Sequence, residues 1–128
     1  MQRSFVGEII RESLIDLTVL NGFKSFLVKS RVQNVKNFGP PLWHLERYHM
    51  PIESLKQLIP LIENNINKSE WYIHFYAEDA NEMFVVLPGK TFQLPKYKDS
   101  SWTKMIEYGE QVGVGRHWTE NIPVDFKN

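Results

Sequence analysis

Residues 70–77 read EWYIHFYA, and the alternation along this stretch predicts the strand on which the rest of the fold is built. Successive side chains of a strand point to opposite faces, so apolar residues gather on one side and polar aromatic residues on the other. The two sets are Trp71, Ile73, Phe75 and Ala77 against Tyr72, His74 and Tyr76. We expect the apolar set to lie in the core and the polar aromatic set to remain partly exposed.

The segment after this strand predicts two more strands and a helix. Residues 83–87 and 91–94 fit strands, and the Pro88-Gly89 pair between them is typical of a type II turn. From residue 102 the apolar residues predict a helix, capped by Asp99 or Ser100 and ended by Gly113. Residues 114–128 are expected to form an irregular tail.

The segment before this strand predicts a similar unit. Its expected strands are residues 5–14, 24–32 and 42–49. Asn21-Gly22 is a typical hairpin turn between the first two, and the turn-rich residues 33–41 predict a loop. From Ile52 apolar residues recur every three or four positions, which predicts an amphipathic helix. Pro60 predicts a kink or a restart of that helix near its neighbour Ile59.

The order strand-strand-strand-helix thus occurs twice. This pattern predicts an α+β fold, with one antiparallel sheet built from two β-β-β-α units and with the helices packed on one face. We expect each set of three strands to form a meander. The chain is expected to be a single domain over residues 1–128, with sub-units at 1–67 and 70–113.

Composition excludes several classes of function. Fifteen basic residues balance 15 acidic ones, so no overall field attracts nucleic acid or an anionic membrane. The absence of cysteine excludes disulfides, zinc–thiolate sites and cysteine nucleophiles. No apolar run approaches the roughly 20 residues of a membrane-spanning helix. We therefore expect a cytoplasmic protein with no membrane partner and no cofactor.

Two trios of polar side chains form the candidate binding face. The trios are Tyr72, His74 and Tyr76 in the central strand and His44, Glu46 and Tyr48 in the earlier one. If the two strands are neighbours, Glu46 could orient His44 or His74 as an acid–base pair, because histidine titrates near neutral pH. Ordinary packing of aromatic rings across a half-exposed sheet explains the same residues without chemistry, and this reading is favoured.

Metal binding is not predicted. His44 and His49 are five positions apart, so a strand sends them to opposite faces. Two ligands on different faces cannot share an ion.

Nucleic-acid binding is the weakest of the hypotheses. One segment is locally basic through Lys24, Lys29, Arg31 and Lys36. Phe23 and Phe26 are three positions apart, however, so in a strand they would point to opposite faces and could not stack bases together.

The tail contains Arg116-His117-Trp118, residue types that often anchor a partner. The alternative is that Trp118 folds back onto the core, and we favour this packing role.

The closing pattern of the chain resembles a family of small prokaryotic single-domain proteins with no established activity. The residues that carry the resemblance are Trp102, Tyr108-Gly109, Gly113-Val114 and Val124-Asp125-Phe126, together with Glu12-Ser13-Leu14 and Trp71-Tyr72. The resemblance implies a single cytosolic α+β domain and carries no catalytic residues. His74 stands where relatives would have an acidic residue, and residues 115–121 look longer than usual.

Three functional hypotheses follow. The leading one is a non-enzymatic protein-binding module, an adaptor or inhibitor, that uses the aromatic sheet face and residues 33–41. The second is a small enzyme with a histidine–glutamate site, and the third is a weak nucleic-acid binder. A homodimer joined through Tyr72 and Tyr76 is a further alternative.

Overall fold

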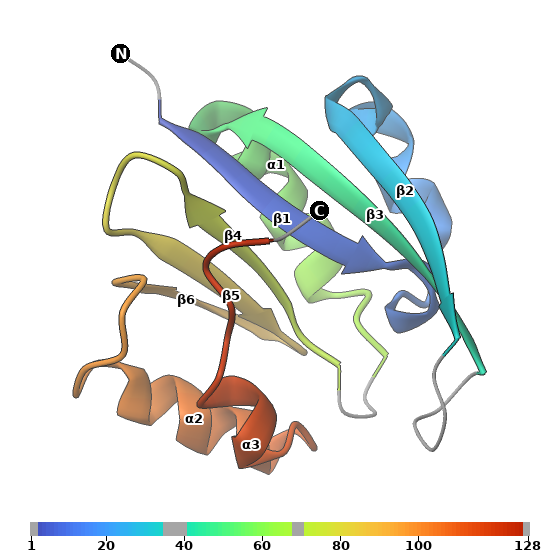
Figure 1. Cartoon of the computed structure of the whole chain (residues 1–128). Coiled ribbons are helices and arrows are strands. Elements are labelled where there is room, and N and C mark those ends of the chain that lie inside the picture. Colours follow the sequence, from blue (N-terminus) through green and yellow to red (C-terminus); the bar gives the residue numbers. More distant parts are fainter. Residues whose placement is uncertain (1–2, 35–40, 68–70, 127–128) are drawn as a thin grey trace.

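The computed structural model describes residues 3–34, 41–67 and 71–126, which form one six-stranded sheet with helices packed against it (Figure 1). The strands are β1 (Ser4–Ile10), β2 (Leu27–Asn34), β3 (Leu42–Pro51), β4 (Ile73–Ala77), β5 (Met83–Leu87) and β6 (Lys90–Leu94). The α-helices are α1 (Ile52–Glu63), α2 (Trp102–Gln111) and α3 (Arg116–Thr119), and two 3-10 helices are η1 (Arg11–Ser13) and η2 (Leu17–Phe26). All the strand pairs are antiparallel, which confirms the predicted α+β class.

The strand order is β2-β3-β1-β4-β5-β6, so the two halves of the chain join where β1 pairs with β4. The second half is the predicted meander, because β4, β5 and β6 are consecutive neighbours. The first half is not a meander, because β1 lies between β3 and β4 instead of beside β2. The expected junction between the halves falls partly on residues 68–70, outside the described residues.

The hairpin predicted at Asn21-Gly22 is wrong, because both residues lie inside η2. Asp16 caps this 3-10 helix by accepting a hydrogen bond from the Thr18 backbone N–H at 2.9 Å. Leu20 and Phe23 are both buried, and their separation of three residues matches one turn of a 3-10 helix. This spacing explains why the segment does not continue the sheet.

The helices cover opposite faces of the sheet, which corrects the expectation that both lie on one face (Figure 1). One buried cluster joins α1 and η2 to β1 and β4 through residues such as Leu58, Phe23 and Phe75. The second joins α2 and the C-terminal tail to β5 through Met105 and Val85, among others. Every residue of β5 is buried and apolar, as in a strand covered on both sides.

The helices and turns of the second half follow the sequence closely. Asp99 Oδ1 accepts a hydrogen bond from the Ser101 backbone N–H at 2.8 Å, just before α2 begins. Gly89 and Gly113 adopt positive φ values of 83° and 95°, as the predicted turn and helix end require. The expected irregular tail contains the short helix α3, which corrects that prediction. Of the kink or restart predicted near Pro60, the restart does not occur, because α1 runs through this residue.

Gly7 allows the two halves of the sheet to approach closely. It pairs with Tyr48 on β3 and with Phe75 on β4. A Cβ atom at this position would overlap the Phe75 ring and would lie 2.7 Å from the His74 carbonyl oxygen. Glycine is therefore required in the middle of β1 for steric reasons.

Within the described part of the chain, none of the helices has the length and apolar character to cross a membrane.

Candidate functional site

A hollow of about 180 Å³ lies on the α3 side of the sheet, where most of its wall is aromatic. We call it the aromatic hollow and define it by Trp43, Trp71, Tyr72, His74, Trp118 and Phe126. Glu8, Ile10, Leu45 and Pro123 complete its lining. Two of the residues predicted for the binding face, Tyr72 and His74, therefore lie in it.

Strand register brings these side chains to one face of the sheet. Ile10 pairs with Leu45, so the two side chains point to the same side. Val6 pairs with Tyr76, and the period of two then places Glu8 and His74 on that side as well. Three strands thus contribute to the floor of the hollow.

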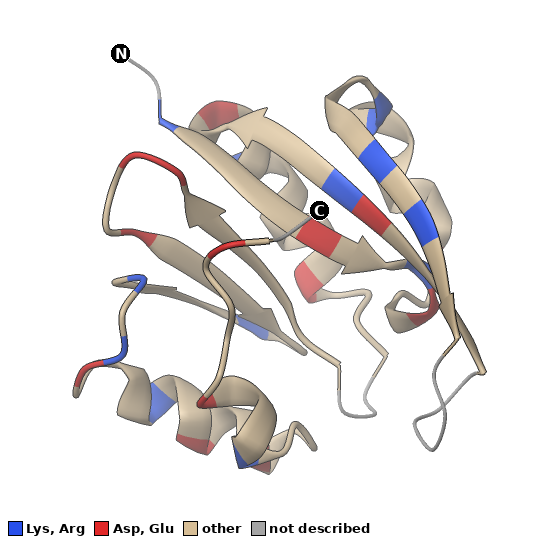
Figure 2. Ribbon diagram, viewed as in Figure 1, with Lys and Arg blue, Asp and Glu red and all other residues tan. Residues whose placement is uncertain are grey.

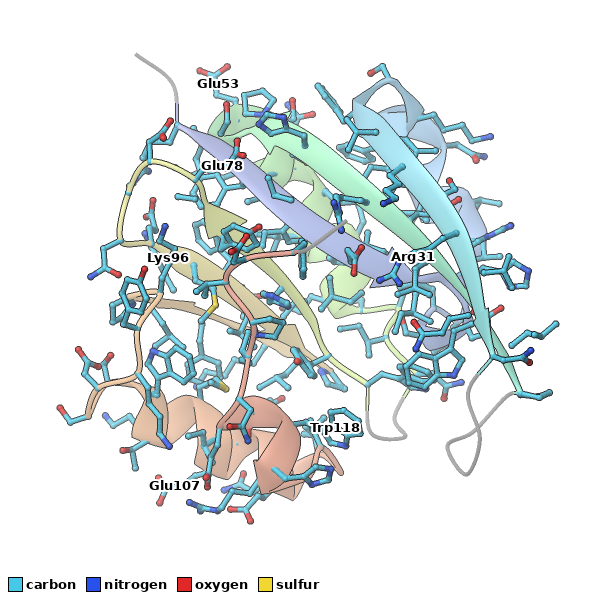
Figure 3. The ribbon with its side chains drawn as sticks, viewed as in Figure 1. Arg31, Glu53, Glu78, Lys96, Glu107 and Trp118 are labelled. Atoms are coloured by element: carbon cyan, nitrogen blue, oxygen red, sulfur yellow. The ribbon has the colours of Figure 1, made fainter. Side chains whose placement is uncertain are left out.

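Two tryptophan rings form one wall. The Trp43 and Trp71 rings meet edge to face, with centroids 5.1 Å apart and an interplanar angle of 60°. Trp118 extends from α3 toward the sheet and supplies the opposite side (Figure 3). Its ring also packs against the second buried cluster, as expected for a side chain that folds back onto the core.

The C-terminal tail crosses the sheet (Figure 1) and covers His74 and Tyr76 of the first predicted trio. The Phe126 backbone N–H donates to the Tyr76 hydroxyl oxygen at 3.1 Å. The Phe126 ring lies 5.4 Å from the His74 ring, 5.2 Å from the Tyr76 ring and 5.2 Å from the Arg47 guanidinium carbon. His74 and Tyr76 are consequently buried, which corrects the expectation of an exposed face.

His74 is held in one orientation and is neutral near pH 7. Its Nε2 lies 2.6 Å from the Pro123 carbonyl oxygen, which can only accept a hydrogen bond. Burial lowers the pKa of His74 to about 4, against the opposing effects of that hydrogen bond and of the Glu8 charge. Burial also raises the pKa of the Tyr72 hydroxyl to about 12, so this group stays protonated.

Among the described residues that line the hollow, Glu8 alone carries a carboxylate, and two arginines compensate its charge. Arg31 on β2 lies 3.2 Å from one carboxylate oxygen, and Arg47 on β3 lies 3.1 Å from the other. Figure 2 shows these basic positions on β2 and β3 beside the acidic position on β1, and Figure 3 labels Arg31. The ion pairs tie three strands together at the edge of the hollow.

The second predicted trio lies on the other face of the sheet, so His44 and Glu46 cannot form a site with His74. Tyr48 pairs with Gly7, next to Ile9 and Phe5 of the first buried cluster. Its hydroxyl donates to Glu46 at 3.0 Å, and burial, with the Glu46 charge, raises the pKa of Tyr48.

His44 has a carboxylate partner that the sequence did not indicate. Glu12 accepts a hydrogen bond from the His44 backbone N–H at 2.7 Å, and its other oxygen lies 2.6 Å from His44 Nδ1. Burial acts to raise the pKa of Glu12, but these hydrogen bonds outweigh it and the pKa is lowered. His44 lines a hollow of about 290 Å³, and a second hollow of about 430 Å³ shares Arg11 and Glu46 with the first. We call the two hollows together the polar groove.

The remaining sequence hypotheses are placed as follows. Phe23 is buried in the first cluster and cannot stack on a base. Residues 35–40 of the expected binding loop lie outside the described residues. In the described ranges, no three histidine, aspartate or glutamate side chains converge as a set of metal ligands.

Comparison with protein-family models, curated proteins and solved structures finds no match to this chain. The resemblance to small prokaryotic single-domain proteins stays a prediction.

Proposed function

We propose that the chain is a non-enzymatic binding module, and that its aromatic hollow receives an apolar group of another protein. The observation that carries the proposal is the hollow itself, about 180 Å³ in volume and lined mainly by aromatic rings. A cavity of about 150 Å³ is large enough to hold a benzene ring. An open, mostly apolar concavity with a few polar groups and a histidine of shifted pKa is the usual starting point for a binding site.

The energetic argument concerns one anchoring side chain. Burial of a large apolar side chain contributes roughly 1.5–3 kcal/mol. Side chains that fill such a hollow commonly dominate the affinity of an interface, while the contacts around them contribute little. The contact between the Trp43 and Trp71 rings and the hydrogen bond from His74 to the tail already order the walls of the hollow. Binding of a partner therefore does not have to include the free-energy cost of ordering them.

A displayed peptide library selected on the immobilised chain tests this proposal. Selected peptides should share an apolar or aromatic residue, and Tyr72→Ala should weaken their binding by roughly tenfold or more, as for a hot-spot contact. Tyr97→Ala is the matched control, because Tyr97 is 68% exposed and outside the hollow. Equal binding to wild type and Tyr72→Ala, with both folded by circular dichroism, would count against the hollow.

A second candidate function is an acid–base enzyme site in the polar groove. The Glu12–His44 pair supports this candidate. When the Glu12 carboxylate accepts from Nδ1–H, the lone pair of the His44 ring is on Nε2, and this nitrogen can act as a base. His44 would then remove a proton from water as its oxygen bonds to the ester carbon or phosphorus, and would return that proton to the leaving oxygen as the ester bond breaks. Arg11, which lines both parts of the groove, would hold an anionic group of the substrate.

Hydrolysis of a panel of carboxylate and phosphate esters tests this second candidate. His44→Gln should abolish the turnover of wild type. His49→Gln should leave turnover unchanged, because His49 makes a similar pair with Glu78 at 2.9 Å but lies outside the groove. Turnover no greater than that of His44→Gln would reject the enzyme reading.

A further inference from the structure

We propose that the occupant of the aromatic hollow is a tryptophan or tyrosine side chain of a partner protein, and that its N–H or O–H donates to Nδ1 of His74. This inference rests on the proposed function and adds the chemical identity of the occupant. It is argued from the tautomer of His74, the surroundings of its ring and the charges at the hollow.

The hydrogen bond to the tail decides the tautomer. Nε2 lies 2.6 Å from the Pro123 carbonyl oxygen, so Nε2 carries the proton. Nδ1 of the neutral ring therefore has a lone pair and accepts. The described residues give Nδ1 no hydrogen bond, although the side chain is 6% exposed and lines the hollow.

The ring of His74 cannot turn away from the hollow. The Tyr72 and Tyr76 rings flank it at 5.8 and 6.4 Å, and Phe126 meets it at 5.4 Å. Rotation would also break the bond to Pro123. Nδ1 is thus an acceptor held in a fixed position, so a donor that enters the hollow gains a preorganised partner.

Charges at the hollow favour a neutral donor. Glu8 lies across from His74 on β1 and already accepts from Arg31 and Arg47. The described lining therefore offers an ammonium group no carboxylate that still lacks a cation. A carboxylate would place its lone pairs against those of Nδ1 and Glu8. A neutral N–H or O–H on an aromatic ring satisfies both the acceptor and the apolar walls.

Two ligands that differ in one hydrogen-bond donor test the inference: N-acetyltryptophanamide and its indole N-methyl derivative. Titration of each into the full chain, followed by NMR, should show the N–H ligand binding roughly three- to tenfold more tightly, the usual size of one hydrogen bond. Tyr97→Ala should keep this preference.

His74→Gln and His74→Leu complete the experiment. Leucine removes both the N–H and the acceptor, whereas glutamine keeps an N–H that can reach the Pro123 carbonyl and an amide oxygen that accepts from a different position than Nδ1. We expect His74→Leu to lose the preference, because no acceptor is left. His74→Gln should reduce the preference, because its acceptor is displaced.

The outcomes separate the two proposals. Equal affinity of wild type for the two ligands, or a preference that persists in both His74 variants, overturns the donor assignment and leaves the hollow as a binding site. Failure of both ligands to bind overturns the proposed function also. Tighter binding of free indole than of N-acetyltryptophanamide overturns the assignment to a side chain and points to a small aromatic molecule.

Discussion

Gly7 is a residue at which the sheet leaves no room for a side chain. Gly7→Ala forces a Cβ atom into the Phe75 ring and against the His74 carbonyl oxygen, at the junction of β1 and β4. We expect the free energy of unfolding to fall by roughly 1–3 kcal/mol, as for other overpacked positions. Urea denaturation measures the change.

Gly22→Ala is the control for this substitution, because a Cβ at Gly22 meets nothing within 4 Å. It should change the free energy of unfolding by less than about 0.5 kcal/mol, as for a typical surface substitution. Equal effects of the two substitutions would contradict the steric argument.

His74 should make stability depend on pH. Burial lowers its pKa from 6.5 to about 4 in the folded chain, so between these values the unfolded chain binds more protons. Stability should therefore rise with pH across this window and fall by a few kcal/mol as the pH drops from about 6.5 to about 4. Urea denaturation at several pH values measures the slope.

His74→Gln should flatten this pH dependence, because glutamine does not titrate. Gly22→Ala, which leaves every titratable group in place and meets nothing within 4 Å, should keep this pH dependence. A slope that persists in His74→Gln would assign the effect to carboxylates.

The sequence predicts which side chains of residues 71–77 share a face of the sheet. It does not predict how far the polar aromatic side chains among them are exposed. Alternation alone places Tyr72, His74 and Tyr76 together. Their cover comes from Pro123 and Phe126, distant in the chain and without a local pattern that signals the contact. Glu12 was missed as the partner of His44 for the same reason.

At the scale of elements, three sets of contacts hold the C-terminal tail against the sheet. Its hydrogen bonds go to His74 and Tyr76, and the Phe126 ring adds contacts with both rings and with Arg47. Phe126→Ala should loosen residues 122–126 and lower the free energy of unfolding by about 1–3 kcal/mol, less than for a fully buried phenylalanine.

Hydrogen exchange of the tail amides, followed by NMR, measures that loosening. Asp125→Ala is the matched control, because Asp125 is exposed and next in sequence. Unchanged exchange in Phe126→Ala would show that the two backbone hydrogen bonds hold the tail without the ring.

Elements with strong local signals were predicted well, and those chosen by distant packing were not. The apolar stripe of α1 and the glycines after β5 and α2 are local signals. Residues 17–26 contain the Asn21-Gly22 pair of a hairpin turn, yet the burial of Leu20 and Phe23 selects a 3-10 helix. The order of the strands depends on pairing between segments far apart in the chain. The alternation of apolar and polar residues within one strand does not indicate which strand is its neighbour.

At the scale of the whole molecule, helices α1 and α2 cover opposite faces of the sheet. The exposed sheet face that was expected to join two copies of the chain is therefore covered. Tyr76 is buried under the tail, so it cannot form a seam with a second copy. The edge strand β2 carries Lys29 and Arg31, and charges of this kind oppose pairing of sheet edges. We expect a monomer, and light scattering at micromolar concentration should give a mass of 15.1 kDa. A dimer mass would contradict this and would direct attention to the edge strands.

The position of β1 has a consequence for how the protein is made. This strand is translated before both of its neighbours, β3 and β4, and Phe5 pairs with both Met50 and Ala77. One edge of β1 therefore stays unpaired until β3 has been made, and the other edge stays unpaired until β4 has been made. Late closure of such distant pairs slows folding. During this time nascent β1 has an unpaired strand edge, of the kind that chaperones protect from aggregation.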